Sequence, residues 1–273
     1  MVTRRCFSLE FNIETFLNDS HNSSFIFYPQ KIKKPRDLEP DCSILEVTMD
    51  DGISIGGLFY LGEPSQPTLL MFHGNGEIAM EYEDIIDQYL KCGVNCAIMD
   101  FRGYGFSDGR PTYLKLIQDS LPIYTFISQW LKNHKYSQRI ILFGRSLGSV
   151  CAVEIASHIP PHLEGIVIES GFCDTYALMR NLFMFNVPEL TPEVIKPWSN
   201  KIRIQKIQCP TLILHGAQDW IIPVTQAHDI KVNLVNSSKI SIKLIEHAGH
   251  NDIQGFREQY FSTLKLFVIS VSK

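Results

Sequence analysis

The sequence predicts an α/β protein, with a mostly parallel eight-stranded sheet flanked by helices and a small insertion placed as a lid. Two observations carry this prediction. From about residue 44 onward, short β-branched or apolar runs alternate with longer segments of helical periodicity, which is the pattern of a parallel sheet covered on both faces. The 273 residues, of which 45% are hydrophobic, can bury one sizeable core, so one main domain is expected.

Eight runs have the length and the residue types of strands. The first two are separated by Asp50-Asp51-Gly52, and this Asp-Gly turn signal favours an antiparallel hairpin. The six later runs are separated by longer segments, mostly of helical periodicity, and are expected to be parallel. In chain order, the predicted strands cover residues 44–49, 53–60, 68–72, 94–100, 139–143, 163–168, 211–214 and 240–245.

Three segments have apolar residues at helical spacing, and each is expected to pack one face against the sheet. They run from Ile78 to Tyr89, from Leu114 to Leu131 and from Ile253 to Val271. Pro122 lies inside the second segment and is a position at which that helix could kink.

The two remaining parts of the chain do not follow this alternation. Residues 1–40 are predicted to form an irregular arm, which leaves residues 41–273 as the main domain. Residues 171–208 are rich in Met, Phe and Pro and do not fit one helix. We expect them to form an insertion over the edge of the sheet at which the parallel strands end.

Composition excludes several classes of function. The net charge of −4 gives no electrostatic reason to expect binding to nucleic acid. The longest apolar runs, such as residues 68–72, are far shorter than the roughly 18 residues of a membrane-spanning helix, and the N-terminal stretch has no apolar signal region. The seven cysteines are scattered without a CxxC pair, which favours a reducing compartment and a cytoplasmic location. The composition does not predict an oligomeric state.

A candidate nucleophile lies between a predicted strand and a helical stretch. Gly144-Arg145-Ser146-Leu147-Gly148 follows residues 139–143 and precedes residues 149–156, which is the context that a G-x-S-x-G elbow requires. Side chains in place of the two glycines would collide with the backbone of a turn sharp enough to expose the Ser146 hydroxyl. Ser146 is therefore the predicted catalytic nucleophile.

A nucleophilic serine needs N–H donors for the negative charge that develops on the substrate oxygen. One donor is expected to be the backbone N–H of Leu147, next to Ser146. The other is expected from Phe72-His73-Gly74-Asn75-Gly76, where glycines let the main chain approach the substrate. The backbone N–H groups of Asn75 and Leu147 are therefore predicted to form the oxyanion hole, with Gly76 as the alternative to Asn75.

Other polar residues near this edge have a structural interpretation. His73 is expected to anchor its loop by a hydrogen bond. Arg102 and Asp108 are expected to form a structural ion pair in the loop after the strand 94–100. Asp252 is expected to cap the last helix.

A serine nucleophile also requires a base and an acid that holds the base in one tautomer. Asp219 and His250 follow two later strands, in the order Ser, Asp, His, and are predicted to take these roles. Asp174 is the alternative acid and His247 the alternative base. Because His247 and His250 lack the helix and the Glu of H-E-x-x-H, a metal pair is not expected.

These motifs together resemble the α/β-hydrolase superfamily, and within it the serine hydrolases similar to the eukaryotic protein depalmitoylases and their bacterial relatives. The resemblance covers residues 44–270 and implies the α/β-hydrolase fold with a Ser146–His250–Asp219 triad. It is poorly specific for substrate, because the superfamily includes esterases, thioesterases, lipases and peptidases. The motifs that carry it are His73-Gly74-Asn75-Gly76, Asp100-Phe101-Arg102-Gly103-Tyr104-Gly105, Gly144-Arg145-Ser146-Leu147-Gly148, His215-Gly216-Ala217-Gln218-Asp219 and Gly249-His250-Asn251-Asp252.

The leading functional hypothesis is hydrolysis of a carboxylic ester or thioester through an acyl-Ser146 intermediate. The substrate would be a small molecule or an acylated partner, and no cofactor is expected. An aminopeptidase of the proline-iminopeptidase kind, with Glu189 and Glu193 holding the substrate amine, is an alternative. A non-catalytic binding protein that retains the fold is a third possibility.

The insertion contains an apolar cluster that could contact an acyl chain. Such a cluster is too apolar to leave in water, and flexible methionines suit a chain of variable shape. The alternative is that these residues only attach the insertion to the core. The predicted acyl-pocket residues are Met179, Leu182, Phe183 and Met184.

Overall fold

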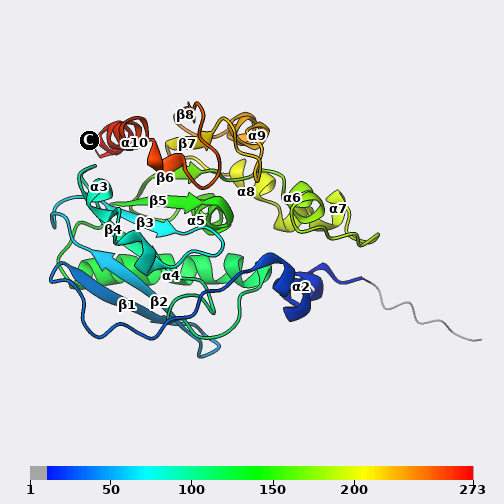
Figure 1. Cartoon of the computed structure of the whole chain (residues 1–273), viewed down its shortest axis with the longest axis horizontal. Coiled ribbons are helices and arrows are strands. Elements are labelled where there is room, and N and C mark those ends of the chain that lie inside the picture. The colour runs from blue at the N-terminus through cyan, green and yellow to red at the C-terminus, as the bar shows by residue number, and fades with distance from the viewer. Residues whose placement is uncertain (1–10, 273) are drawn as a thin grey trace, which may run out of the picture.

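The computed structural model describes residues 11–272 and contains one eight-stranded sheet, with strand order β1-β2-β4-β3-β5-β6-β7-β8 (Figure 1). All eight predicted strands are present, so the predicted fold class is confirmed. The bounds are β1 Cys42–Thr48, β2 Ser54–Tyr60, β3 Thr68–Phe72, β4 Asn95–Met99, β5 Ile140–Arg145, β6 Leu163–Glu169, β7 Thr211–Gly216 and β8 Ile240–Ile245.

Strand direction differs from the prediction in one detail. The hairpin of β1 and β2 forms as expected, with Gly52 at φ +79° in its turn. However, β2 also pairs antiparallel with β4, and the remaining pairs are parallel. In this sheet β2 therefore runs against the other seven strands, because β1 and β4 share the direction of the parallel set.

Helices cover both faces of the sheet and enclose two buried clusters (Figure 1). One face carries α4 (Tyr113–Asn133), which contains Pro122, together with α5 (Ser149–Ser157) and α9 (Thr225–Asn233). The other face carries α3 (Ile86–Leu90) and α10 (Arg257–Val271). β3 and β5, which lead to His73 and Ser146, are buried along their whole length, whereas β8, which leads to His250, is mostly half-buried.

Two of the predicted helices are interrupted. The first consists of a short turn, η1 (Ala79–Tyr82), and α3, because Ile85 leaves the helical region with φ −125° and ψ −5°. The last consists of η4 (Ile253–Gly255) and α10, separated by Phe256 at φ −80° and ψ 52°. The apolar spacing predicted which face is buried, but it could not show these breaks.

The N-terminal segment is more ordered than expected. Within the described residues 11–40, α1 (Ile13–Asn18) is capped by Asn12 and α2 (Ser20–Ile26) by Asp19, so the prediction of an irregular arm is wrong there. Leu17, Ile26 and Phe27 are buried in the same cluster as α4. The domain boundary at residue 40 stays a prediction.

The insertion lies at the same end of the molecule as α2 (Figure 1). The Phe185 ring contacts Phe16 and Phe25 of the N-terminal segment edge-on, with ring centroids 5.2 and 6.2 Å apart. Apolar contacts therefore join the two segments. The elements of the insertion are α6 (Thr175–Asn181), α7 (Pro192–Ile195), η3 (Lys196–Trp198) and α8 (Asn200–Ile204).

None of the helices in residues 11–272 has the length and hydropathy to cross a membrane. The six cysteines within that range are all free thiols. Burial raises the pKa of Cys151 and of Cys173 to about 12, so both are protonated at neutral pH. Cys6 lies outside the described residues.

Candidate active site

Ser146 lies on a sharp turn between β5 and α5, with a left-handed backbone at φ +51°. The two glycines of the motif make this turn possible. A Cβ at Gly144 would lie 2.6 Å from the Ser149 Cα, and one at Gly148 would lie 2.1 Å from the Phe72 carbonyl oxygen. Both approaches are too close for any side chain, so the turn has the steric properties predicted for a nucleophile elbow.

The three side chains predicted to form the triad lie in hydrogen-bond contact. The Nε2 atom of His250 is 2.9 Å from the Ser146 hydroxyl oxygen, and its Nδ1 atom is 2.7 Å from Asp219 Oδ2. His250 and Asp219 are buried, whereas Ser146 is partly exposed. The hydroxyl is therefore accessible from the solvent side, while its partners are screened from water.

The Asp219 carboxylate is held by several donors. Burial by itself would raise the pKa of Asp219, but the hydrogen bond from His250 and the backbone N–H of Ile222 outweigh it, so the pKa is lowered. Its Oδ1 atom accepts N–H bonds from Ile221 (2.9 Å) and Ile222 (2.8 Å). The carboxylate is thus ionised at neutral pH and fixed in position.

The alternative acid and base lie elsewhere. Asp174 caps α6, where its carboxylate accepts the Ala177 N–H at 3.0 Å. His247 is exposed, and its Nδ1 atom is 3.4 Å from the Gln218 side chain. Asp252 accepts the Gly249 N–H at 2.6 Å and makes no cap hydrogen bond, so the prediction that it caps the last helix is wrong.

Ser146, Asn75 and Leu147 line one cavity of about 290 Å³, together with His250. Within residues 11–272, the backbone N–H groups of Asn75 and Leu147 donate to no other protein group. His73 has the anchoring contact expected of it, since its Nδ1 atom lies 2.7 Å from the Gly74 carbonyl oxygen. Two free donors therefore lie at the wall of the cavity that holds the Ser146 hydroxyl.

The predicted acyl-pocket residues divide into two pairs. Leu182 and Phe183 line the Ser146 cavity. Met179 and Met184 do not: Met179 is fully buried in the core on the inner face of α6, and Met184 is 76% exposed. Met184 is exposed because α6 ends at Asn181 and Met184 has φ +57°, so the helical spacing assumed for these residues does not continue.

Most of the remaining cavity wall could not be identified from motifs. It is predominantly apolar and comes from the N-terminal segment, the insertion and the loop after β7. No short motif marks these positions, because each is an ordinary apolar side chain until the chain has folded. These residues include Tyr28, Phe172, Leu178, Ile221 and Ile222.

A buried ionic network behind the site was also missed. Arg145, at the variable position of the elbow motif, contacts Glu77 (2.7 Å) and Glu169 (2.9 Å) and donates to the His250 carbonyl oxygen at 3.1 Å. Burial would raise the pKa of Glu77, but the Arg145 charge outweighs it and the pKa is lowered. Glu77 in turn accepts the Gly74 N–H at 3.0 Å. The guanidinium thus connects the elbow with residues 73–77, named here the oxyanion loop, and with residues 247–252, named here the histidine loop.

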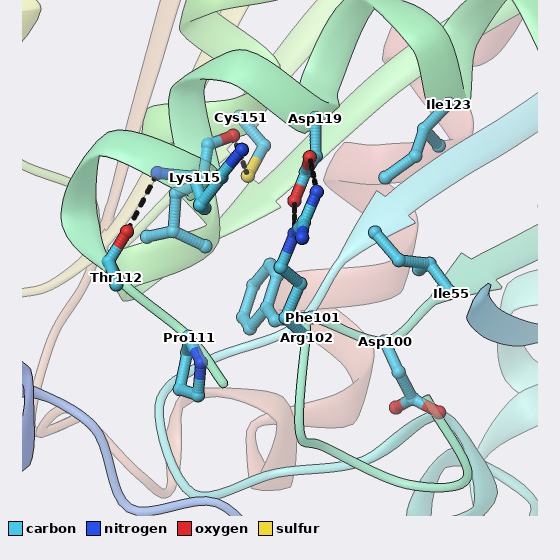
Figure 2. A pocket seen from close by; sticks show the side chains of 11 residues that line it. Ile55, Asp100, Phe101, Arg102, Pro111, Thr112, Lys115, Asp119, Ile123 and Cys151 are labelled. Carbon is cyan, nitrogen blue, oxygen red and sulfur yellow. Dashed lines mark hydrogen bonds and ion pairs between the residues drawn. The ribbon is translucent and has the colours of Figure 1, made fainter. Parts of the chain in front are cut away.

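Arg102 has different partners from the one predicted. Figure 2 shows it paired with Asp119 of α4, at 2.6 Å, beside a hollow of about 10 Å³. It also contacts Asp51 at 2.7 Å. The expected Arg102–Asp108 pair is therefore wrong, because the guanidinium turns inward to α4. No residue that lines this hollow also lines the Ser146 cavity, so we assign the Arg102–Asp119 pair to the stability of the fold and not to the active site.

The fold and the elbow define an α/β hydrolase. Residues 63–202 match the family described as "Serine aminopeptidase, S33", which is about half of the chain. The chain belongs to this family and to the α/β-hydrolase superfamily.

Curated proteins with similar sequences cover most of the chain. Protein bem46 of Schizosaccharomyces pombe is 24% identical over 82% of this chain and 75% of its own length. Alpha/beta hydrolase domain-containing protein 17C of Homo sapiens is 29% identical over 78% of this chain and 62% of its own length. The chain thus spans only about three fifths to three quarters of these relatives.

Solved structures support the fold. The Pyrococcus furiosus esterase Pf2001 superposes with a TM-score of 0.70 at 22% identity, covering 89% of this chain and 99% of the esterase. At this level of identity the similarity shows a common fold and does not identify the substrate.

Proposed function

We propose that the protein is a serine hydrolase that cleaves a carboxylic ester or thioester through an acyl-Ser146 intermediate. The observation that carries this proposal is the continuous contact from the Ser146 hydroxyl through His250 to Asp219. Membership of a hydrolase family and the free N–H donors at the cavity wall support it.

The geometry suggests the path of each proton. His250 Nε2 accepts the Ser146 proton as the serine oxygen attacks the carbonyl carbon, and the imidazolium is stabilised by Asp219. The carbonyl oxygen gains the negative charge and accepts hydrogen bonds from the Asn75 and Leu147 N–H groups. His250 then gives its proton to the departing alcohol or thiol. Water repeats the sequence on the acyl-enzyme, with His250 again as base, and releases the acid.

The cavity favours an acyl chain over a strongly polar substrate. Its wall consists mainly of apolar side chains, including Leu182 and Phe183 of the insertion and Ile222 after β7. A volume of about 290 Å³ lies at the lower end of the range of small-molecule sites. We therefore propose acyl groups of medium length rather than acetyl as the preferred substrates.

An aminopeptidase remains the second candidate, because the matched family carries that description. It would need a free carboxylate near Ser146 to bind the substrate amine. Glu189 and Glu193 are exposed, and neither lines the Ser146 cavity. Glu77 does line it, but its oxygens are engaged by Arg145, Gly74 and Tyr82. The contacts therefore favour an ester or thioester.

The test is labelling with a fluorophosphonate probe, followed by kinetics on p-nitrophenyl esters from acetate to palmitate, on matched acyl thioesters and on aminoacyl p-nitroanilides. We expect labelling of Ser146 and the highest kcat/KM on a medium-chain ester or thioester. Preferential cleavage of the anilides would favour the aminopeptidase. A protein that neither reacts with the probe nor turns over any substrate would be a binding protein with a hydrolase fold.

The free, protonated thiols fit a reducing compartment, and we propose that the protein acts in the cytoplasm. Fractionation of cells that express the full-length protein tests this location. Recovery in an oxidising compartment would contradict it.

A further inference from the structure

The Asn75 side chain forms hydrogen bonds to two other segments of the chain. Its Oδ1 atom accepts the Tyr104 hydroxyl at 2.7 Å and the Tyr28 N–H at 3.1 Å. Its Nδ2 atom donates to the Ile26 carbonyl oxygen at 2.6 Å. One carboxamide thus joins three parts of the chain: the oxyanion loop, the loop after β4 and the end of α2.

The N-terminal segment continues along the same two loops after this contact. The Gln30 side chain donates to the Gly76 carbonyl oxygen, and the Gln30 carbonyl oxygen accepts the Gly105 N–H at 2.8 Å. The Ile32 N–H then donates to the Gly105 carbonyl oxygen, also at 2.8 Å. Residues 26–32 therefore lie as a strap across the oxyanion loop and the loop that carries Tyr104.

We propose that this strap, residues 26–32, is a working part of the active site and that it positions the oxyanion donor through the Asn75 carboxamide. The inference rests on the proposed acyl-serine chemistry. Asn75 has two separate functions in it: its backbone N–H is the donor, and its side chain is the positioning group. Tyr104 acts through that side chain, whereas the strap contacts the loop both through it and directly, from Gln30 to the Gly76 carbonyl oxygen.

The physical reason is the low tolerance of oxyanion stabilisation to misplacement. A donor is effective when it lies about 2.7–3.1 Å from the oxygen of the tetrahedral intermediate, and loss of one donor costs on the order of a hundredfold in rate or more. Gly74 and Gly76 flank Asn75 and leave the loop backbone little resistance of its own, with Gly76 at φ +82°. Three hydrogen bonds to the carboxamide supply the missing rigidity.

The Tyr104 hydroxyl is suited to this role because it is buried. Burial raises its pKa, although the neighbouring backbone N–H groups of Tyr28 and Gly76 act in the opposite direction. The hydroxyl therefore stays protonated and donates to Asn75 Oδ1.

The strap also contributes directly to the cavity. Tyr28 lines the cavity and is exposed to solvent. The same segment that positions the donor thus borders the space for the acyl chain. A substrate that contacts Tyr28 would therefore also contact the strap that is hydrogen-bonded to the oxyanion loop.

The experiment compares Asn75→Ala and Tyr104→Phe with the parent, because both variants keep every backbone N–H. Asn22→Ala is the matched control: its carboxamide donates to the Phe16 carbonyl oxygen at 3.1 Å, within the N-terminal segment but away from the oxyanion loop. The readouts are kcat, KM, the pH profile, the melting temperature and the inhibition constant of an acyl trifluoromethyl ketone. That inhibitor adds to a serine hydroxyl and places an oxyanion in the hole.

For Asn75→Ala we expect kcat to fall about 10- to 100-fold. This loss is smaller than for a deleted donor, because the backbone N–H is still present and is only less well placed. KM should change less than about threefold, and the inhibition constant should rise in proportion to the loss of kcat/KM. Tyr104→Phe should lower kcat and raise the inhibition constant by only a few-fold, again with little change in KM. Asn22→Ala should match the parent in all of these quantities. Unchanged pH profiles would locate the effect outside His250 and Asp219.

An active parent enzyme whose Asn75→Ala and Tyr104→Phe variants bind the ketone as tightly as the parent would overturn this inference and leave the proposed function intact. A parent that does not react with fluorophosphonate at Ser146 would overturn both. If Asn75→Ala does not fold, Tyr104→Phe alone decides. It removes one hydroxyl, and the Tyr28 N–H, which donates to that hydroxyl at 3.0 Å, keeps Asn75 Oδ1 as its other acceptor.

Discussion

Two regions meet at the Ser146 cavity and are held in different ways. The site loops (residues 73–77, 145–148, 215–222 and 247–252) are joined by buried hydrogen bonds and by the Arg145 ion pairs. The cap (residues 11–25 and 171–208) packs mainly through apolar contacts such as Phe16 against Phe185. Polar networks fix directions, whereas apolar packing is non-directional. We therefore expect the chemistry to depend on the site loops and the substrate preference to depend on the cap.

The largest expected effect is in the site loops. Ser146→Ala should lower kcat on a p-nitrophenyl ester by at least roughly a thousandfold. Alanine has a Cβ like serine and meets the same backbone constraint at φ +51°, so the melting temperature should change little. Turnover at the parent rate would show that another residue is the nucleophile.

Replacing the acid should have nearly as large an effect. Asp219→Asn removes the negative charge beside His250 Nδ1 and favours the wrong tautomer, so we expect kcat to fall by about a thousandfold or more. Asp174→Asn is the matched control, since asparagine also caps a helix well. The opposite ranking of the two variants would move the acid to Asp174.

The buried ionic network should have its main effect on stability. Arg145→Met leaves Glu77 and Glu169 without their shared counter-charge, and breaking a buried pair from one side costs about 3–5 kcal/mol. Lys34→Met, at the exposed Lys34–Glu46 pair, should cost less than about 1 kcal/mol. Urea unfolding of both variants measures the difference, and equal losses would mean that the Arg145 network adds no more than a surface pair.

The cap should affect selectivity and not the basic reaction. Phe183→Ser should reduce the preference for longer acyl chains, because each buried methylene contributes up to about 0.8 kcal/mol, roughly fourfold in rate. Met184→Ser should leave the chain-length profile unchanged, since Met184 is exposed outside the cavity. Kinetics on an ester series distinguish them, and identical profiles for Phe183→Ser and the parent would remove the cap from substrate recognition.

The smallest expected effect is on how the free energy of unfolding depends on pH. Burial lowers the pKa of His215, which packs beside Asp219, so the folded protein keeps this imidazole neutral. The unfolded chain takes up a proton below its ordinary pKa of about 6.5. The contribution of His215 to stability is therefore complete above that pH and is lost as the pH falls. Unfolding free energies measured from pH 8 to pH 5 should decline less steeply for His215→Gln than for the parent.

The site loops could be predicted from the sequence much better than the cap. The sequence could bring Ser146, Asp219 and His250 together as candidates because glycine and strand context leave few alternatives, and these side chains do lie in hydrogen-bond contact. The cap was predicted poorly for a physical reason: an apolar residue such as Met184 has the same preference for burial wherever it lies, and the end of α6 decides its direction. Arg145 was missed because its position in the motif accepts many residue types. Its partners, Glu77 and Glu169, come from distant strands.

The contacts of Arg145 also bear on how the molecule opens. One guanidinium binds carboxylates on the oxyanion loop and on β6 and a carbonyl oxygen of the histidine loop, so detaching any of these segments leaves a buried polar group without its partner. Local unfolding normally proceeds in small independent units. Here we expect the backbone amides of these segments to exchange with deuterium at one shared opening free energy, well above that of the cap. Partial denaturation would then remove substrate selectivity first and activity later, in a single step.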